Sequence, residues 1–276
     1  MSALKNKTRI SQNIPLRLLR EGRPFLVPIY YAMLTSFLAR EGIKNSGSYL
    51  FADHIYVGKP NGRFFVGALL DAVLLKLPSS ASFKKRYEYT RDGVIKKLLY
   101  SKTQEPKRVL SVPCGIPREL VEAATYLRSA APEIYDQTMF YCVDLDLQTI
   151  EEARRFVEAH GHNNFVFVRA DALKSAAYPL RFDCIVSTGF NEFIDDDELL
   201  TFFTNAINAL REDGLFITSL TKKHHLSDYL MKNVAELFVH YRSEDRLCSI
   251  AKNAGAKNVT ISCDPIGCQL FIDATK

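Results

Sequence analysis

The sequence predicts an α/β fold in which a mostly parallel, seven-stranded sheet carries helices on both faces, preceded by a helical segment. From residue 107 onward, apolar strand-like runs alternate with helical repeats. Before that point the apolar patterns are helical and are broken by turn-forming clusters at 45–48 and 59–62. The charge divides at nearly the same place. Residues 1–108 contain 20 Lys and Arg against 7 Asp and Glu, whereas residues 109–276 contain 16 against 24.

The N-terminal segment is expected to form helices over 24–39, 64–75 and 83–99. Between the first two, residues 49–56 are predicted to be a polar-aromatic connector. Helix 64–75 is apolar on nearly every face, with Asp71 as its only charge, which predicts a buried helix or one at an interface such as that of a homodimer. We therefore expect a helical cap on the substrate side, residues 1–106, followed by an α/β domain, residues 107–276.

The α/β domain is expected to contain seven strands, which are apolar runs bounded by polar or turn-forming residues. They are 108–112, 138–143, 164–169, 182–187, 214–219, 257–263 and 267–273. Apolar residues recur at helical spacing over 147–159 and 196–210. Three aspartates, 195–197, precede the second of these helices, where the helix dipole favours negative charge. The last two strands are predicted to form an antiparallel hairpin.

Composition indicates an ordinary globular chain: 276 residues, 47% hydrophobic and 24% charged. The six cysteines show no C-x-x-C spacing, which favours buried free thiols in a reducing compartment. The first 13 residues lack the apolar core of a secretion signal, and the longest uncharged run, 24–39, is too short to span a membrane. We therefore expect a cytoplasmic protein without a membrane span.

Residues 108–120 pass from an apolar strand through a turn of small residues into the start of a helix. The next strand, 138–143, ends on Asp144. This arrangement can hold an adenosine-like ligand, because the turn offers backbone N–H groups and the acid can accept both ribose hydroxyls. The turn contains Gly115 between two prolines and lacks the G-x-G-x-x-G glycines that a pyrophosphate requires. The pattern thus disfavours a dinucleotide and favours a nucleoside without phosphates.

Residues 84–276 resemble the class I S-adenosylmethionine-dependent methyltransferases, whose catalytic domain is Rossmann-like. Five segments in the family's order carry the resemblance: 109–115, 143–146, 168–172, 182–189 and 211–217. The sequence departs from the family pattern at the prolines of the first motif and at an insert over 128–137. The resemblance implies S-adenosyl-L-methionine as the cofactor and S-adenosyl-L-homocysteine as its product.

The resemblance also implies the residues that contact the cofactor. They are Tyr89, Arg91, Val112, Pro113, Cys114, Gly115, Asp144, Leu145, Asp171, Ala172, Ser187, Thr188 and Gly189. Asp144 would bind the ribose, with Asp146 as the alternative. Asp171 would accept a hydrogen bond from the adenine amine. Tyr89 or Arg91 would bind the methionine carboxylate.

Methyl transfer depends chiefly on positioning the acceptor, assisted by a base where the acceptor is not already nucleophilic. The base candidates are His54, Glu192, His224, His225 and Tyr241. Contacts to the substrate are expected from Tyr30, Tyr31, Tyr56, Phe190 and Asn191. No metal is expected, because no cluster of His, Asp and Glu has the spacing of a ligand set.

The predicted function is methyl transfer to an oxygen, nitrogen or carbon of a small organic acceptor, either anionic or carried on an acidic protein. The basic N-terminal segment and the lack of an Asn-Pro-Pro-aromatic run after the fourth strand favour this over a nucleic acid. Two alternatives remain open: an RNA or other nucleic-acid methyltransferase that uses the basic segment, and a non-catalytic interaction protein that binds the cofactor. The missing glycines disfavour an NAD-binding oxidoreductase.

Overall fold

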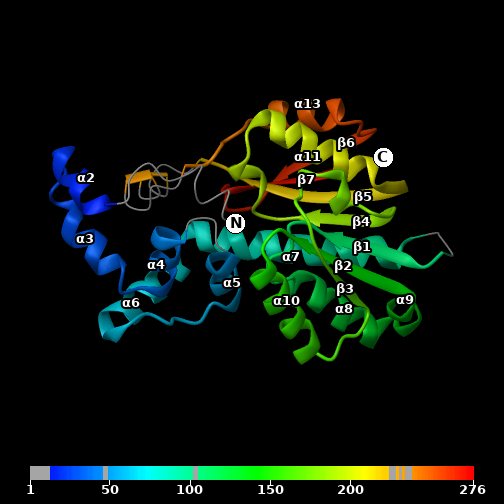
Figure 1. The fold of residues 1–276 in the computed structure, drawn as a ribbon, viewed down its shortest axis with the longest axis horizontal. Coiled ribbons are helices and arrows are strands. Elements are labelled where there is room, and N and C mark those ends of the chain that lie inside the picture. Colours follow the sequence, from blue (N-terminus) through cyan, green and yellow to red (C-terminus); the bar gives the residue numbers. More distant parts are fainter. Residues whose placement is uncertain (1–12, 46–48, 102–104, 224–227, 230–231, 234–237) are drawn as a thin grey trace. The chain divides into compact units, whose positions relative to one another are not determined.

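The computed structural model describes residues 13–45, 49–101, 105–223, 228–229, 232–233 and 238–276. The chain forms two compact units (Figure 1). The first comprises the described residues up to Lys85 together with those in Lys222–Tyr241 and Pro265–Cys268. The second comprises the described residues of Arg86–Thr221, Arg242–Asp264 and Gln269–Lys276. The first unit therefore includes two segments that the sequence pattern assigns to the second domain.

The second unit contains a seven-stranded sheet in the order β3-β2-β1-β4-β5-β7-β6. The strands are β1 (Lys107–Ser111), β2 (Thr138–Asp144), β3 (Phe165–Arg169), β4 (Phe182–Ser187), β5 (Leu210–Thr221), β6 (Asn258–Cys263) and β7 (Gln269–Thr275). The first five pair in parallel, and β7 runs antiparallel to both β5 and β6. The predicted mostly parallel sheet with a closing antiparallel hairpin is confirmed.

Helices cover both faces of this sheet, as Figure 1 shows. The residues from Arg86 onward of α7 (Pro78–Leu99) lie on one face with α8 (Arg118–Ala130) and α10 (Leu147–Ala159). Helices α11 (Asp196–Asn208) and α13 (Glu244–Asn253) lie on the other. The short helix α9 (Pro132–Asp136) follows α8 within the predicted insert.

Apolar side chains from both layers fill the core. On the first face, Val94 and Leu120 pack with Val109, Phe140 and Val186 of the central strands, and all five are fully buried. On the second face, Phe202 and Phe203 of α11 pack edge to face on Phe216 of β5. Burial on both faces explains why the central strands are nearly continuous apolar runs. The carboxyl ends of the parallel strands meet at one edge, where open α/β sheets bind their ligands.

The described part of the first unit is helical. It contains α2 (Ile14–Arg20), α3 (Leu26–Met33), α4 (Phe37–Lys44), α5 (Tyr49–Val57), α6 (Phe64–Leu75) and the first residues of α7. The single helix predicted over 24–39 is wrong: two helices form, because the Ser36 hydroxyl accepts a hydrogen bond from the Ala39 N–H and starts α4. The predicted connector 49–56 is also wrong, since α5 occupies it.

A buried carboxylate joins the helices of the first unit. Asp71 of α6 accepts hydrogen bonds from the Ser36 hydroxyl (2.6 Å) and from the backbone N–H groups of Leu38 (2.9 Å) and Asn61 (2.8 Å). Its Oδ2 also lies 2.7 Å from His54 Nε2. Burial raises the pKa of Asp71, but these hydrogen bonds outweigh burial and lower it overall. The single charge on an otherwise apolar helix is therefore the polar centre of the unit.

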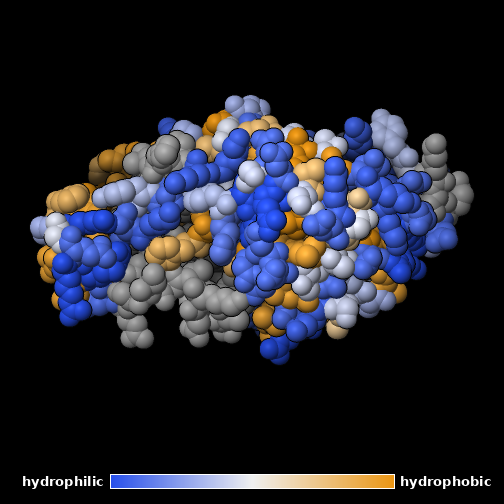
Figure 2. Space-filling model, turned by 90° about the horizontal axis from the view of Figure 1, so that it is seen from above, coloured by the Kyte–Doolittle hydropathy of each residue, from blue (hydrophilic) through white to orange (hydrophobic). Residues whose placement is uncertain are grey.

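Another face of α6 is exposed. Its apolar side chains that are more than half exposed are Phe64, Phe65, Val66, Leu69 and Val73. Figure 2 shows hydrophobic side chains among hydrophilic ones at the surface of the molecule. Among the described residues, no single helix is long and apolar enough to cross a membrane, although the bent pair α6 and α7 has the necessary length and composition together.

The cysteines are all free thiols. Four of them, residues 114, 142, 184 and 268, are buried as expected. Cys263 is exposed, contrary to expectation, because it ends the outermost strand β6, whose residues are mostly exposed or half-buried.

Candidate functional site

The turn after β1 is held between the two neighbouring strands. The Val112 N–H donates to the Val186 carbonyl of β4 (3.0 Å), and the Cys114 N–H donates to the Val143 carbonyl of β2 (2.8 Å). Gly115 has a φ of 52°, in the left-handed region that favours glycine. Its N–H donates to Asp144 Oδ2 at 3.2 Å. The glycine of the first motif and the acid that ends β2 are thus joined directly.

Asp144 is largely buried at the carboxyl end of β2. Its second oxygen accepts a hydrogen bond from the Asp146 N–H at 3.1 Å. Burial raises the pKa of Asp144, and the two backbone hydrogen bonds partly oppose this. A carboxylate has about four lone-pair sites, so it can accept further hydrogen bonds from a ligand. Asp146 instead caps α10 by accepting from the Gln148 N–H, so the two acids have different surroundings.

The loop after β3 reaches the same edge of the sheet. The Ala170 N–H donates to the Asp144 carbonyl at 3.0 Å. Asp171 accepts at Oδ1 from the Leu173 N–H (3.0 Å), which shapes a local turn. The carbonyl of buried Ala172 accepts from the Tyr178 hydroxyl at 2.9 Å. The predicted ribose and adenine residues therefore lie on adjacent, hydrogen-bonded segments.

Strand β4 ends at buried Ser187, and the loop after it passes through Thr188 to Gly189, whose φ is 76°. Phe190 and Asn191, predicted to contact the substrate, turn inward. Phe190 packs edge to face on Phe202, with ring centroids 5.1 Å apart. The fully buried Asn191 amide donates to Thr218 Oγ1 and to the Ser219 carbonyl, both at 2.9 Å. Helix α11 supplies the partner of Phe190 and β5 those of Asn191, and the substrate contacts predicted for both residues stay predictions.

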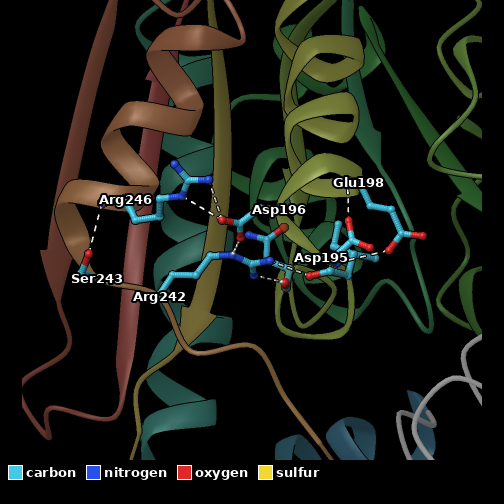
Figure 3. A network of polar contacts seen from close by, with 8 residues as sticks. Asp195, Asp196, Glu198, Arg242, Ser243 and Arg246 are labelled. Atoms are coloured by element: carbon cyan, nitrogen blue, oxygen red, sulfur yellow. Dashed lines mark hydrogen bonds and ion pairs between the residues drawn. The ribbon is translucent and has the colours of Figure 1, made fainter.

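Arg242 anchors the same loop from outside (Figure 3). Its guanidinium donates to the carbonyls of Asn191 (2.8 Å) and Ile194 (2.6 Å), on either side of Glu192, and to the carboxylate of Asp196 (2.6 Å). Arg246 of α13 also donates to Asp196, at 2.8 Å. The predicted acidic start of α11 thus has a structural explanation, and a capping box between Asp195 and Glu198 completes it.

A buried pair of opposite charges lies beside this loop. Arg86 of α7 is 2% exposed, and its Nη1 is 3.7 Å from Oε1 of Glu192, which is 3% exposed. The guanidinium also lies against Gly189, because a Cβ placed on that glycine would be 3.1 Å from Nη1. Glu192 Oε1 accepts a hydrogen bond from the Thr221 hydroxyl at 3.1 Å. The sequence patterns identified Glu192 but missed Arg86.

Glu119 was missed as well. It is buried in the first turn of α8, directly after the first motif. Burial raises its pKa to about 7, although its backbone hydrogen bond and the charge of Arg86 act in the opposite direction. The one signal in the sequence is a charged pair, Arg118 and Glu119, at the start of the helix that follows the motif.

Tyr89 and Arg91, predicted to bind the methionine carboxylate, are both engaged with other protein groups. The Tyr89 hydroxyl donates to Asp273 of β7 (2.7 Å), and its ring stacks on Phe271. Arg91 is paired with Asp92 (2.8 Å) and with Glu122 of α8 (3.1 Å). Their roles toward the cofactor stay predictions, and they depend on which face of α7 meets the carboxyl ends of the strands. Arg86 lies there instead, two turns before Gly93, which packs closely on Ile217 of β5.

The other base and substrate candidates among the described residues belong to the first unit. His54 is buried against Asp71, which leaves the imidazole engaged within that unit. Tyr30 and Tyr31 pack edge to face on each other, with centroids 5.3 Å apart. His224 and His225 lie outside the described residues. The roles predicted for Tyr56, in α5, and for Tyr241 stay predictions.

Comparison with known proteins agrees with the fold. Residues 109–214 match the family described as "Methyltransferase domain". No curated protein matches the sequence. The structure is similar to a possible exported protein from Bordetella parapertussis, with a TM-score of 0.75 at 18% identity over 91% of this chain and 86% of that one.

Two further solved structures share the fold. One is magnesium protoporphyrin IX methyltransferase from Synechocystis with S-adenosylhomocysteine bound, with a TM-score of 0.55 at 13% identity over 85% of this chain and 97% of that one. The other is an S-adenosylmethionine-dependent methyltransferase from Clostridium acetobutylicum, with a TM-score of 0.51 at 16% identity over 68% and 91%. At these identities the structures establish the fold.

Proposed function

We propose that this chain, whose residues 109–214 match a methyltransferase domain, is a class I S-adenosylmethionine-dependent methyltransferase that transfers the methyl group of its cofactor to a small organic acceptor. One observation carries the assignment of the cofactor site: the Gly115 N–H donates directly to Asp144, so the first-motif turn and the acid at the end of β2 form one structure. A strand-end carboxylate held beside a glycine turn suits a nucleoside with two vicinal hydroxyls, because the carboxylate can accept from both.

The residues at this edge fit S-adenosylmethionine. Asp144 would accept from the ribose hydroxyls, and Asp171 with the Ala172 N–H would recognise the edge of the adenine. Leu145, which is 38% exposed, offers apolar surface beside the acid. The cofactor supplies a methyl group already activated on a sulfonium. The chain therefore has to hold the acceptor in line with that methyl group and exclude competing nucleophiles.

The proposal of a small organic acceptor rests on the character of the N-terminal part of the chain. Residues 1–108 carry 20 basic against 7 acidic side chains, and Phe25, Tyr31, Phe64 and Phe65 are more than half exposed. Basic and aromatic groups together suit an acceptor with an apolar body and a negative charge. One similar structure is a methyltransferase named for such a molecule, magnesium protoporphyrin IX. Basic charge without the exposed aromatic groups would equally suit the alternative acceptor, a nucleic acid.

The test is to incubate the protein with methyl-labelled S-adenosylmethionine and either bulk RNA or a small-metabolite extract. We expect label in the small-molecule fraction, and none there with an Asp144→Ala variant. Binding to RNA should be weak and should vanish by roughly 150 mM salt, because only non-specific phosphate contacts would support it. Salt-resistant RNA binding together with label in RNA would overturn the proposed acceptor class and leave methyl transfer intact.

A further inference from the structure

The carboxyl ends of β4 and β5 surround a group of buried polar atoms that protein contacts do not fully satisfy. Oε2 of Glu192 and Oγ of Ser219 are both buried, and neither has a hydrogen-bond partner among the described residues. Most buried polar atoms in proteins are hydrogen-bonded, and each one that is not costs free energy. Such atoms at the ligand-binding edge of a sheet indicate a site for a polar ligand.

The charges in this group are of both signs. Arg86 supplies a buried cation and Glu192 a buried carboxylate, and the 3.7 Å between their nearest atoms is longer than a hydrogen bond. The carboxylate is held in place by Thr221 through Oε1, which leaves Oε2 for another donor. Because the pair is neutral as a whole, a ligand with one positive and one negative group can bind without adding net charge to the buried site.

The pair is also in the right place along the chain. The Val112 N–H bonds to the Val186 carbonyl, so the first-motif turn directly adjoins the end of β4. Gly189, three residues further on, lies against the Arg86 guanidinium, and its lack of a side chain permits that approach. The nucleoside site at Gly115 and Asp144 and the charged pair thus occupy neighbouring strand ends of one sheet.

We propose that Arg86 and Glu192 bind the amino-acid end of the cofactor, a role that rests on the proposed function. The guanidinium holds the α-carboxylate, Glu192 Oε2 accepts from the α-ammonium, and Ser219 Oγ adds a hydrogen bond. Glu192 then has a binding role in place of the base role predicted for it. Arg86 takes the role predicted for Arg91. We call Arg86 and Glu192 the zwitterion clamp.

The clamp can be tested by comparing two ligands that share a nucleoside and differ in the amino-acid end. S-adenosylhomocysteine has the α-amino and α-carboxyl groups, and 5′-methylthioadenosine lacks both. Calorimetry would measure the affinity of each ligand for the full chain and for Arg86→Met, Glu192→Gln and Arg91→Met variants. Arg91→Met serves as the comparison on the same helix, since that side chain pairs with Asp92 and Glu122.

We expect Arg86→Met and Glu192→Gln each to weaken S-adenosylhomocysteine binding by about 10- to 100-fold, as for the loss of a charge-assisted hydrogen bond. Both should bind 5′-methylthioadenosine within about twofold of wild type, which also shows that the variants are folded. Arg91→Met should bind both ligands normally. An Asp144→Ala variant should lose both ligands.

Three results would overturn the clamp. One is unchanged S-adenosylhomocysteine affinity in Arg86→Met. Another is an equal loss of both ligands in Arg86→Met and Glu192→Gln, which would make the pair structural. The third is a selective loss of S-adenosylhomocysteine in Arg91→Met alone. Failure of the wild-type protein to bind either ligand would instead overturn the proposed function, and the clamp with it.

Discussion

Burial raises the pKa of two carboxyl groups of the second unit, those of Asp144 and Glu119. Asp144 accepts from two backbone N–H groups, whereas the pKa of Glu119 is raised to about 7 by burial that its own backbone contact and Arg86 do not offset. Glu119 therefore changes charge near neutral pH, four residues after Gly115 in the turn that should bind the cofactor. The free energy that burial of the ionised Glu119 carboxylate costs in folding can be measured without an assay of function.

We predict that Glu119→Gln stabilises the protein at alkaline but not at acidic pH. The ordinary pKa of 4.5 applies to the unfolded chain and about 7 to the folded one, so the folded state binds the proton more tightly. The free energy of unfolding of the wild type should thus fall as the pH rises from about 4.5 to 7, by about 3 kcal/mol in all. Glutamine removes this loss. Urea unfolding at pH 5 and pH 8 measures the difference.

The control for this prediction is Glu122→Gln, on the same helix, whose side chain is 52% exposed. It should leave the pH dependence of stability nearly as in the wild type. Parallel stability curves for the wild type and Glu119→Gln between pH 5 and pH 8 would show that Glu119 titrates normally.

At Asp144 we predict that alanine weakens S-adenosylhomocysteine binding at least ~100-fold, since two hydrogen bonds to the ribose would be lost at about 1.5–3 kcal/mol each. Asp146→Asn is the matched control, because asparagine also caps helices and can replace Asp146 at the start of α10. Calorimetry on folded variants gives both values. Near wild-type affinity in Asp144→Ala would contradict the prediction, and Asp146 would then be the candidate for the ribose contact.

Among the elements, the loop after β4 is held by contacts distant in sequence. Asn191 attaches it to β5, and Arg242, just before α13, bonds to backbone carbonyls on both sides of Glu192. The Arg242 side chain is only 4% exposed, so these hydrogen bonds are shielded from water. The orientation of Glu192 therefore depends on a residue that need not touch any ligand.

Removal of this anchor should loosen the loop selectively. We predict that Arg242→Ala lowers the free energy of unfolding by about 2–4 kcal/mol, because buried carbonyls lose a charged donor. Amide exchange over 188–194 should accelerate more than exchange in β1 and β2. Arg246→Ala, which loses only the contact to Asp196 from a side chain 54% exposed, should cost less than about 1 kcal/mol. Equal effects of the two substitutions would argue against a specific role for Arg242.

At the scale of the whole molecule, the two units present different surfaces to solvent. The sheet of the second unit is covered by helices on both faces, whereas α6 of the first unit exposes a row of large apolar side chains. Apolar groups exposed together on one helix face are typical of surfaces that bind a partner. A second copy of the chain is the partner predicted for this helix.

We predict that the wild-type protein self-associates at micromolar concentration and that Phe65→Asp shifts it toward the monomer. Phe65 is 83% exposed, and burying such a side chain is worth about 1.5–3 kcal/mol for each copy. Sedimentation equilibrium measures the shift. Tyr100→Asp, at an exposed aromatic residue of the second unit, is the control and should not change the mass. A monomeric wild type at all concentrations would contradict the prediction.

Local physical chemistry made much of the second unit predictable. All seven strands begin and end within four residues of their predicted bounds, and α10 spans 147–159 as predicted. These elements could be predicted because the apolar periodicity of a strand or helix is visible in neighbouring residues of the sequence. The same holds for Gly115 and Asp144. A turn with a left-handed residue and an acid that ends a strand are both recognisable within a few positions.

The zwitterion clamp could not be predicted in this way. Arg86 and Glu192 are about a hundred residues apart, and they meet because α7 packs on the sheet with Arg86 toward the strand ends. The sequence predicts that Tyr89 and Arg91 of the same helix bind the methionine carboxylate. In the structure Tyr89 contacts Asp273 of β7, and Arg91 contacts Glu122 of α8. The helical period of a sequence indicates which residues share a face of the helix. It does not indicate which face packs against a given strand end, because that depends on how much apolar surface the whole core buries in each orientation.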